Sequence, residues 1–127
     1  MFSHVMLGAD DIEASKRFYD AALGALGVRP GFADPKGRVI YSHAGGLFII
    51  TKPINGEPAT CANGGTLGFA AASPEQADAF HAAGAANGGT PCEDPPGVRE
   101  GAGMKLYLAY LRDPAGNKIC AMYRMPQ

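Results

Sequence analysis

The sequence predicts an α+β domain built from two copies of a β-α-β-β-β unit. Three observations predict it. The same order of strand-like and helix-like patterns occurs twice, each half carries a helix-start signal at a matching place, and each half ends in a hairpin-like pair of strands. With 127 residues, the chain can bury one core without disulfides or metals. We expect one domain over residues 1–127, with units at about 1–54 and 65–127 and a linker at 55–64.

Composition excludes several classes of protein. Hydrophobic residues make up 46% and charged residues 18%, values typical of a globular chain rather than a disordered one. The formal net charge is -1 and no basic stripe occurs, so we expect no nucleic-acid partner. Apolar runs are too short to span a bilayer, and the N-terminus enters a strand-like pattern without a charged leader. We therefore expect no membrane partner, no signal peptide and a cytoplasmic location.

The first unit begins with a strand and a helix. Residues 2–9 alternate loosely between apolar and polar side chains, which predicts a strand. Asp11 is a good helix N-cap; if Asp10 is the cap instead, Glu13 has the spacing to close a capping box. Apolar residues then recur at helical spacing until Gly27, a stop signal.

Three short strands are predicted to complete the first unit. A strand-like stretch covers residues 28–32, and residues 34–37 have the composition of a turn. Residues 39–43 and 47–51 flank Gly45 and Gly46, a pattern typical of a β-hairpin.

The second unit repeats this order. Residues 66–71 predict a strand, and Ser73 is followed by proline at the first helical position and by Gln76, which can close a capping box. The helix is expected to stop at the glycine pair Gly88 and Gly89.

The chain is predicted to end in a hairpin. Residues 90–96 favour a short strand or a loop, and residues 95–103 form a Gly/Pro-rich segment that could act as a mobile lid. Strands at 105–112 and 118–123 flank residues 113–117, whose composition predicts a type I turn followed by a glycine bulge.

A fixed offset relates the two halves. His4 precedes the cap Asp11 by 7 residues, and Thr66 precedes the cap Ser73 by the same 7. At this offset of 62 residues, apolar and acidic positions of the two halves also coincide. We interpret the match as an internal repeat rather than a chance likeness of two strand-helix starts.

The repeat and its motifs resemble the vicinal oxygen chelate superfamily, which includes glyoxalase I, extradiol dioxygenases, fosfomycin-resistance enzymes and bleomycin-binding proteins. The similar stretches are residues 4–5, 11–15, 17–19, 23–27, 95–99 and 112–119. The resemblance covers essentially the whole chain. It implies curved mixed sheets around a cup, with the helices outside.

In metal-dependent members of this superfamily, each unit supplies two ligands, one on its first strand and one on its last. Carried over, these positions are His4, Ile50, Thr66 and Cys120. His4 is a good ligand, whereas isoleucine is none, threonine is weak, and Cys120 would have to be a thiolate. A catalytic site normally needs three protein ligands. We therefore expect the positions to be degenerate and to hold no divalent metal cofactor.

The resemblance also implies that the cup binds a small molecule. Half of the hairpin tyrosines should face it by strand alternation, and counting outward from a paired Asp113 and Asn117 places Tyr110 opposite Cys120. Arg99 could clamp an anionic ligand, and His4 is the acid–base candidate. Each residue has an ordinary structural alternative as core or surface. The candidate ligand-binding residues are Tyr41, Thr66, Arg99, Tyr107, Tyr110 and Cys120.

Three functions stay open at this point. We favour a bleomycin-resistance-like protein that binds a small molecule without metal. The alternatives are a glyoxalase-like metal-dependent lyase or isomerase, of the lactoylglutathione-lyase type, and a structural module with a vestigial cup. Whether the chain is an enzyme is left open. A homodimer is expected from the resemblance, and symmetric homodimers are also the commonest oligomers.

Overall fold

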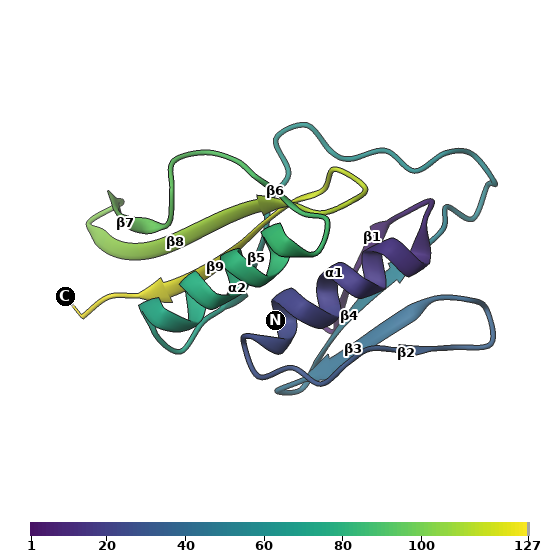
Figure 1. Ribbon diagram of the computed structural model, residues 1–127, viewed down its shortest axis with the longest axis horizontal. Coiled ribbons are helices and arrows are strands. Elements are labelled where there is room, and N and C mark those ends of the chain that lie inside the picture. Colours follow the sequence, from purple (N-terminus) through teal and green to yellow (C-terminus); the bar gives the residue numbers. More distant parts are fainter. Residues whose placement is uncertain (127) are drawn as a thin grey trace.

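The structure, a computed structural model that describes residues 1–126, contains two helices and two mixed sheets (Figure 1). The first unit consists of β1 (His4–Gly8), α1 (Ile12–Gly24), β2 (Phe32–Ala33), β3 (Val39–His43) and β4 (Gly46–Thr51). The second consists of β5 (Leu67–Ala70), α2 (Pro74–Ala86), β6 (Thr90–Pro91), β7 (Gly97–Gly101), β8 (Met104–Arg112) and β9 (Lys118–Arg124). The predicted α+β class and the doubled order are confirmed, with β7 as an addition.

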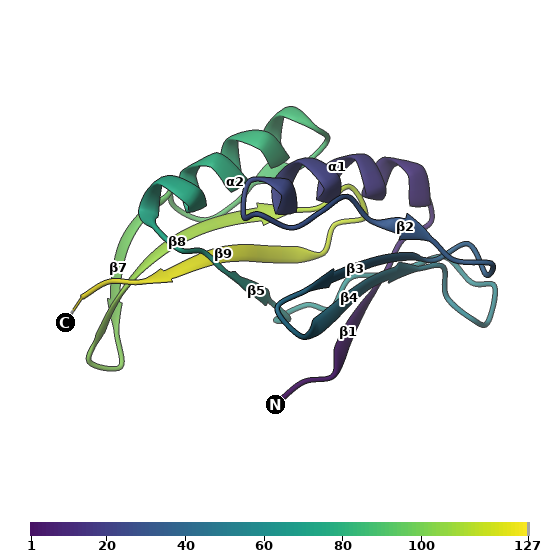
Figure 2. The same ribbon diagram turned by 90° about the horizontal axis from the view of Figure 1, so that it is seen from below.

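Each unit forms its own sheet. The strand order is β1-β4-β3-β2 in the first and β5-β9-β8-β6 in the second, where β7 also pairs with β8. The first strand of each unit runs parallel to the last, and the other pairs are antiparallel. Helices α1 and α2 lie side by side over one face of the two curved sheets (Figure 2). We call the opposite face of the sheets the open face.

Both predicted helix caps are present. Asp11 accepts a hydrogen bond from the backbone N–H of Ala14, and Ser73 accepts one from that of Gln76. Asp10, the alternative cap, instead accepts a backbone N–H from the linker. Neither helix within residues 1–126 is long and apolar enough to cross a membrane.

The prediction of a strand at residues 28–32 is wrong, because β2 consists of Phe32 and Ala33 alone. Gly31 explains the difference. Its backbone N–H donates to Asp20 on α1, and a Cβ there would lie 2.6 Å from the Tyr41 ring. Residues 28–31 therefore stay beside α1, and the chain joins the sheet only at Phe32.

Two hairpin details also differ from the sequence prediction. The first turn is formed by Ala44 and Gly45, both at positive φ, so Gly46 already pairs with His43 in the sheet. The Gly/Pro-rich segment at 95–103 contains the strand β7 rather than a mobile lid. The reason is the length of β8, whose first half extends beyond β6 and offers an unpaired edge to β7.

The core lies between the helices and the sheets, and a polar cluster joins the units within it. Asp113, 3% exposed, accepts hydrogen bonds from the Tyr19 hydroxyl and from the backbone and side-chain N–H groups of Asn117. The Asn117 side chain also donates to the carbonyl of Gly8. Burial, and then the Asp113 carboxylate, raise the pKa of Tyr19, so its hydroxyl stays a donor. We call Tyr19, Asp113 and Asn117 the Asp113 clasp.

Candidate functional site: a cleft between the two units

A cleft of about 530 Å³ opens where the two units meet. It lies between β1, the C-terminal end of α1, the β3–β4 hairpin and β5. Strands β1 and β5 each pair on one side only, with β4 and β9, and no backbone pairing joins them in the part of the chain that the structure describes. Because the two sheets stay separate here, side chains rather than a continuous ladder form the walls.

The walls are apolar because strand alternation turns large side chains toward the helix layer. On β5, Leu67 and Phe69 occupy these positions, while Gly68 between them has no side chain. The Phe69 ring packs edge-on against Phe48 of β4, with centroids 5.2 Å apart. Leu26, after α1, also lines the cleft. These contacts give the cleft rigid hydrophobic walls.

Tyr41, a predicted ligand-binding residue, lies in the cleft wall. Its side chain is 2% exposed, and its hydroxyl donates to Asp20 at 2.8 Å. Asp20 also accepts from the Lys16 ammonium at 2.6 Å. Burial and then Asp20 raise the pKa of Tyr41. Partial burial opposes ionisation of Asp20, but its hydrogen bonds, first that from Lys16, hold its pKa below the usual range. Tyr41 is thus a neutral wall residue whose hydroxyl already has an acceptor.

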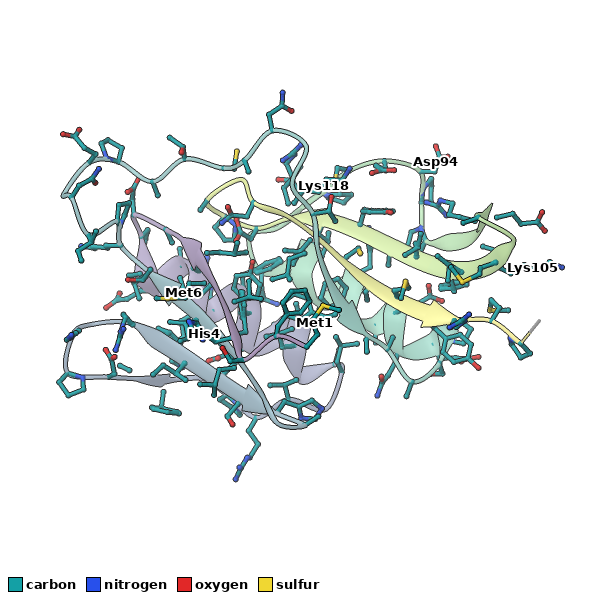
Figure 3. The ribbon with its side chains drawn as sticks, turned by 180° about the vertical axis from the view of Figure 1, so that it is seen from behind. Met1, His4, Met6, Asp94, Lys105 and Lys118 are labelled. Carbon is teal, nitrogen blue, oxygen red and sulfur yellow. The ribbon has the colours of Figure 1, made fainter. Side chains whose placement is uncertain are left out.

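Two other predicted positions are separated from each other. Thr66 lines the cleft and is exposed. His4 does not line it. The imidazole lies on the open face opposite Leu47, with Nδ1 2.8 Å from the Ser3 hydroxyl (Figure 3).

Ile50, carried over as the second metal position, is fully buried and pairs with Leu7 and Val39 in the layer beneath the helices. Strand alternation therefore turns its neighbours Ile49 and Thr51 toward the open face.

Tyr107 and Arg99 also have structural partners instead of a place in a cup. The Tyr107 hydroxyl donates to Asp78 on α2 at 2.7 Å, so this side chain lies on the helix side of β8. The Arg99 guanidinium donates to backbone carbonyls, including those of Asp94 and Gly97. It therefore stabilises the β6–β7 connection rather than projecting as an anion clamp.

Tyr110 and Cys120 pair across β8 and β9, as the turn geometry predicted. Both lie on the second unit and outside the cleft. Cys120 is 6% exposed. The structure thus brings Tyr41 and Thr66 together at the cleft and leaves the other candidates elsewhere.

Comparison with known proteins agrees with this architecture. The sequence profile of the Glyoxalase/Bleomycin resistance protein/Dioxygenase superfamily matches residues 1–121. The chain belongs to this superfamily. A glyoxalase/bleomycin resistance protein from Albidiferax ferrireducens T118 has a crystal structure that is 68% identical, with a TM-score of 0.94, covering 98% of this chain and 99% of that chain.

More distant structures share the fold alone. A glyoxalase-related enzyme from Fulvimarina pelagi is 21% identical with a TM-score of 0.71, covering 96% of this chain and 86% of that chain. A superfamily enzyme from Burkholderia phytofirmans PsJN is 19% identical with a TM-score of 0.70, covering 94% and 95%. No curated protein sequence matches the chain.

The residues of this superfamily member do not fit the divalent metal site of its metal-dependent relatives. No group of three His, Cys, Asp or Glu side chains within residues 1–126 could hold a metal ion. Burial raises the pKa of Cys120 to about 11, so at neutral pH it is a thiol and a poor ligand. His4 faces Leu47 across the sheet, which offers no donor.

Sequence reasoning missed several cleft residues. His43, beside the β3–β4 turn, is exposed and lines the cleft. The sequence shows the alternation of Leu67 and Phe69. A buried core strand would show the same pattern, so the alternation does not identify a cleft wall.

Proposed function

We propose that this chain binds a small, mainly apolar molecule in the cleft between its two units, and that binding uses no divalent metal. The cleft itself carries the proposal. Its volume of about 530 Å³ falls in the range of roughly 300–1,000 Å³ that small-molecule sites occupy. Apolar walls with a few polar groups at the rim are typical of such sites.

The polar groups suit orientation rather than catalysis. His43 and Thr66 line the cleft and are exposed, so each can offer a hydrogen bond to a polar end of the ligand. The Tyr41 hydroxyl already donates to Asp20. The ligand that fits best is therefore an apolar body with one or two polar atoms at the solvent side.

Filling the cleft should weaken binding of an apolar probe. We expect Ala70→Phe, which adds a ring at a cleft-lining position, to weaken N-phenyl-1-naphthylamine binding by about tenfold or more. Fluorescence titration measures the affinity. Ala82→Phe, at an exposed position of α2 outside the cleft, is the matched control and should bind like the parent. Equal affinity in both variants, or loss of binding on adding a chelator, would contradict the proposal.

We further propose a symmetric homodimer that covers the open face of the first unit. Met6, Leu47 and Phe32 are 40%, 41% and 56% exposed on this sheet, an apolar surface that water solvates poorly. A second copy is the favoured occupant because symmetric homodimers are the commonest assemblies.

Light scattering after gel filtration should give twice the chain mass of 13.1 kDa. Leu47→Lys should shift the protein toward the monomer, because it places a charge in the proposed interface. Val98→Lys, at a residue 49% exposed on the second unit, should leave the mass unchanged. A monomeric parent protein would refute the dimer.

A further inference from the structure

Lys118 lies on the open face of the second unit, away from the cleft. Strand alternation along β9 puts it on the same face as Cys120 and Met122, and Cys120 pairs with Tyr110 on β8. Figure 3 looks onto this face and shows Lys118 in the upper part of the view, beside the linker. Neither Lys118 nor Tyr110 lines the cleft, so this part of the surface needs its own explanation.

The Lys118 ammonium contacts two side chains, the aromatic ring of Tyr110 and the carboxylate of Glu93. Its ammonium lies 5.1 Å from the centroid of the Tyr110 ring, within the range of a cation–π interaction. It also forms an ion pair with Glu93, which belongs to the segment between β6 and β7. The hydrogen bond to Glu93 raises the pKa of Lys118, in agreement with a charged ammonium. The Lys118 side chain is 23% exposed, so its alkyl stem packs against the sheet.

Glu93 makes this contact from a strained backbone. Its φ is 59°, in the left-handed region that residues other than glycine rarely adopt. The Glu93 side chain is 43% exposed, and water screens an ion pair at such a position, so the pair itself stabilises weakly. Glu93 can therefore leave Lys118 at little net cost.

The rest of the connection is held in place independently of Glu93. Arg99 donates to the carbonyls of Asp94 at 2.9 Å, Pro95 at 3.0 Å and Gly97 at 3.0 Å. A rotation of the Glu93 side chain would free Lys118 without moving β7. Lys118, Arg99 and Glu93 all interact electrostatically with Tyr110. If Glu93 left, the two positive side chains would remain, and this face would be positive.

We infer that Lys118 binds the carboxylate of a small aromatic or otherwise apolar acid, and that Glu93 holds the place of that carboxylate in the free protein. The apolar body would lie along Tyr110 and Met122, which share the face; Met122 is 39% exposed. The site is separate from the cleft, so it does not depend on the proposed function.

Benzoate and benzamide, which have similar shapes and differ in charge, test this inference. Chemical-shift titration of the labelled protein should show benzoate, and not benzamide, shifting the amides around Lys118. Glu93→Gln removes the competing carboxylate and should tighten benzoate binding about fivefold. Glu93→Gly removes the same carboxylate and tolerates positive φ, so it should tighten binding as well. Lys118→Met should lose the benzoate response.

Glu100→Gln is the matched control. Glu100 pairs with Lys105 at 3.8 Å, and both side chains are more than half exposed, so this variant removes the same charge from the same unit. It should leave benzoate affinity unchanged. The inference is overturned if Glu93→Gln and Glu93→Gly bind benzoate no tighter than the parent. Equal shifts with benzamide, or a full response in folded Lys118→Met, would overturn it as well.

Discussion

An Asp113→Ala variant is expected to lose about 3 kcal/mol of unfolding free energy. Its carboxylate accepts hydrogen bonds from the Tyr19 hydroxyl at 2.6 Å, from the Asn117 side chain at 3.0 Å and from backbone N–H groups of Ala115 and Asn117. Removing it leaves buried donors without an acceptor, which costs more than the loss of the bonds themselves. It also loosens the contact between the units. Urea unfolding followed by circular dichroism measures the change.

Two tyrosine variants compare the contribution of the Asp113 clasp to stability with that of an exposed hydrogen bond of the same kind. Tyr19 and Tyr107 both donate a hydroxyl to an aspartate, at 2.6 and 2.7 Å, but the first pair is buried and the second exposed. We expect Tyr19→Phe to cost about 1–2 kcal/mol and Tyr107→Phe less than about 0.5 kcal/mol. Equal costs for the two would argue against a special role of the clasp.

Gly84→Ala should destabilise the protein by about 1–3 kcal/mol, against the trend of helix propensity. Gly84 lies inside α2, where alanine is normally the better residue. A Cβ there would lie 2.5 Å from Leu111 Cδ1 and 2.9 Å from Phe18 Cε1. Both side chains are fully buried and cannot move aside without disturbing the core.

Gly24→Ala is the matched comparison, since this glycine ends α1 and a Cβ on it meets no atom within 4 Å. We expect the change to be neutral or to stabilise by about 0.5 kcal/mol. Thermal and urea unfolding of both variants check the pair. A stabilising Gly84→Ala would show that α2 packs less tightly on Phe18 than the structure places it.

Local signals account for what could be predicted. The caps Asp11 and Ser73 were identified because a cap needs one side chain and a backbone N–H three residues away. The register of Tyr110 opposite Cys120 followed from counting along a short turn. Such features depend on neighbours in the chain, so the order of residues is enough to find them.

The face of a strand was harder to assign. Ile50 was carried over as a metal position and lies in the core, because a shift of one residue turns a side chain to the other face of a sheet. Arg99 and Tyr107 were expected to meet a ligand and have partners within the protein. Their partners lie on elements distant in sequence or on a segment whose path could not be foreseen.

The sequence by itself determined the doubled β-α-β-β-β unit and the superfamily, since periodicity, caps and turns are encoded over a few residues each. Only the tertiary structure decided where the two units leave a cleft and which residues line it. It also brought Glu93 onto Lys118. The physical reason is that these features arise from packing between segments tens of residues apart, where side-chain shape and the docking of whole sheets set the outcome.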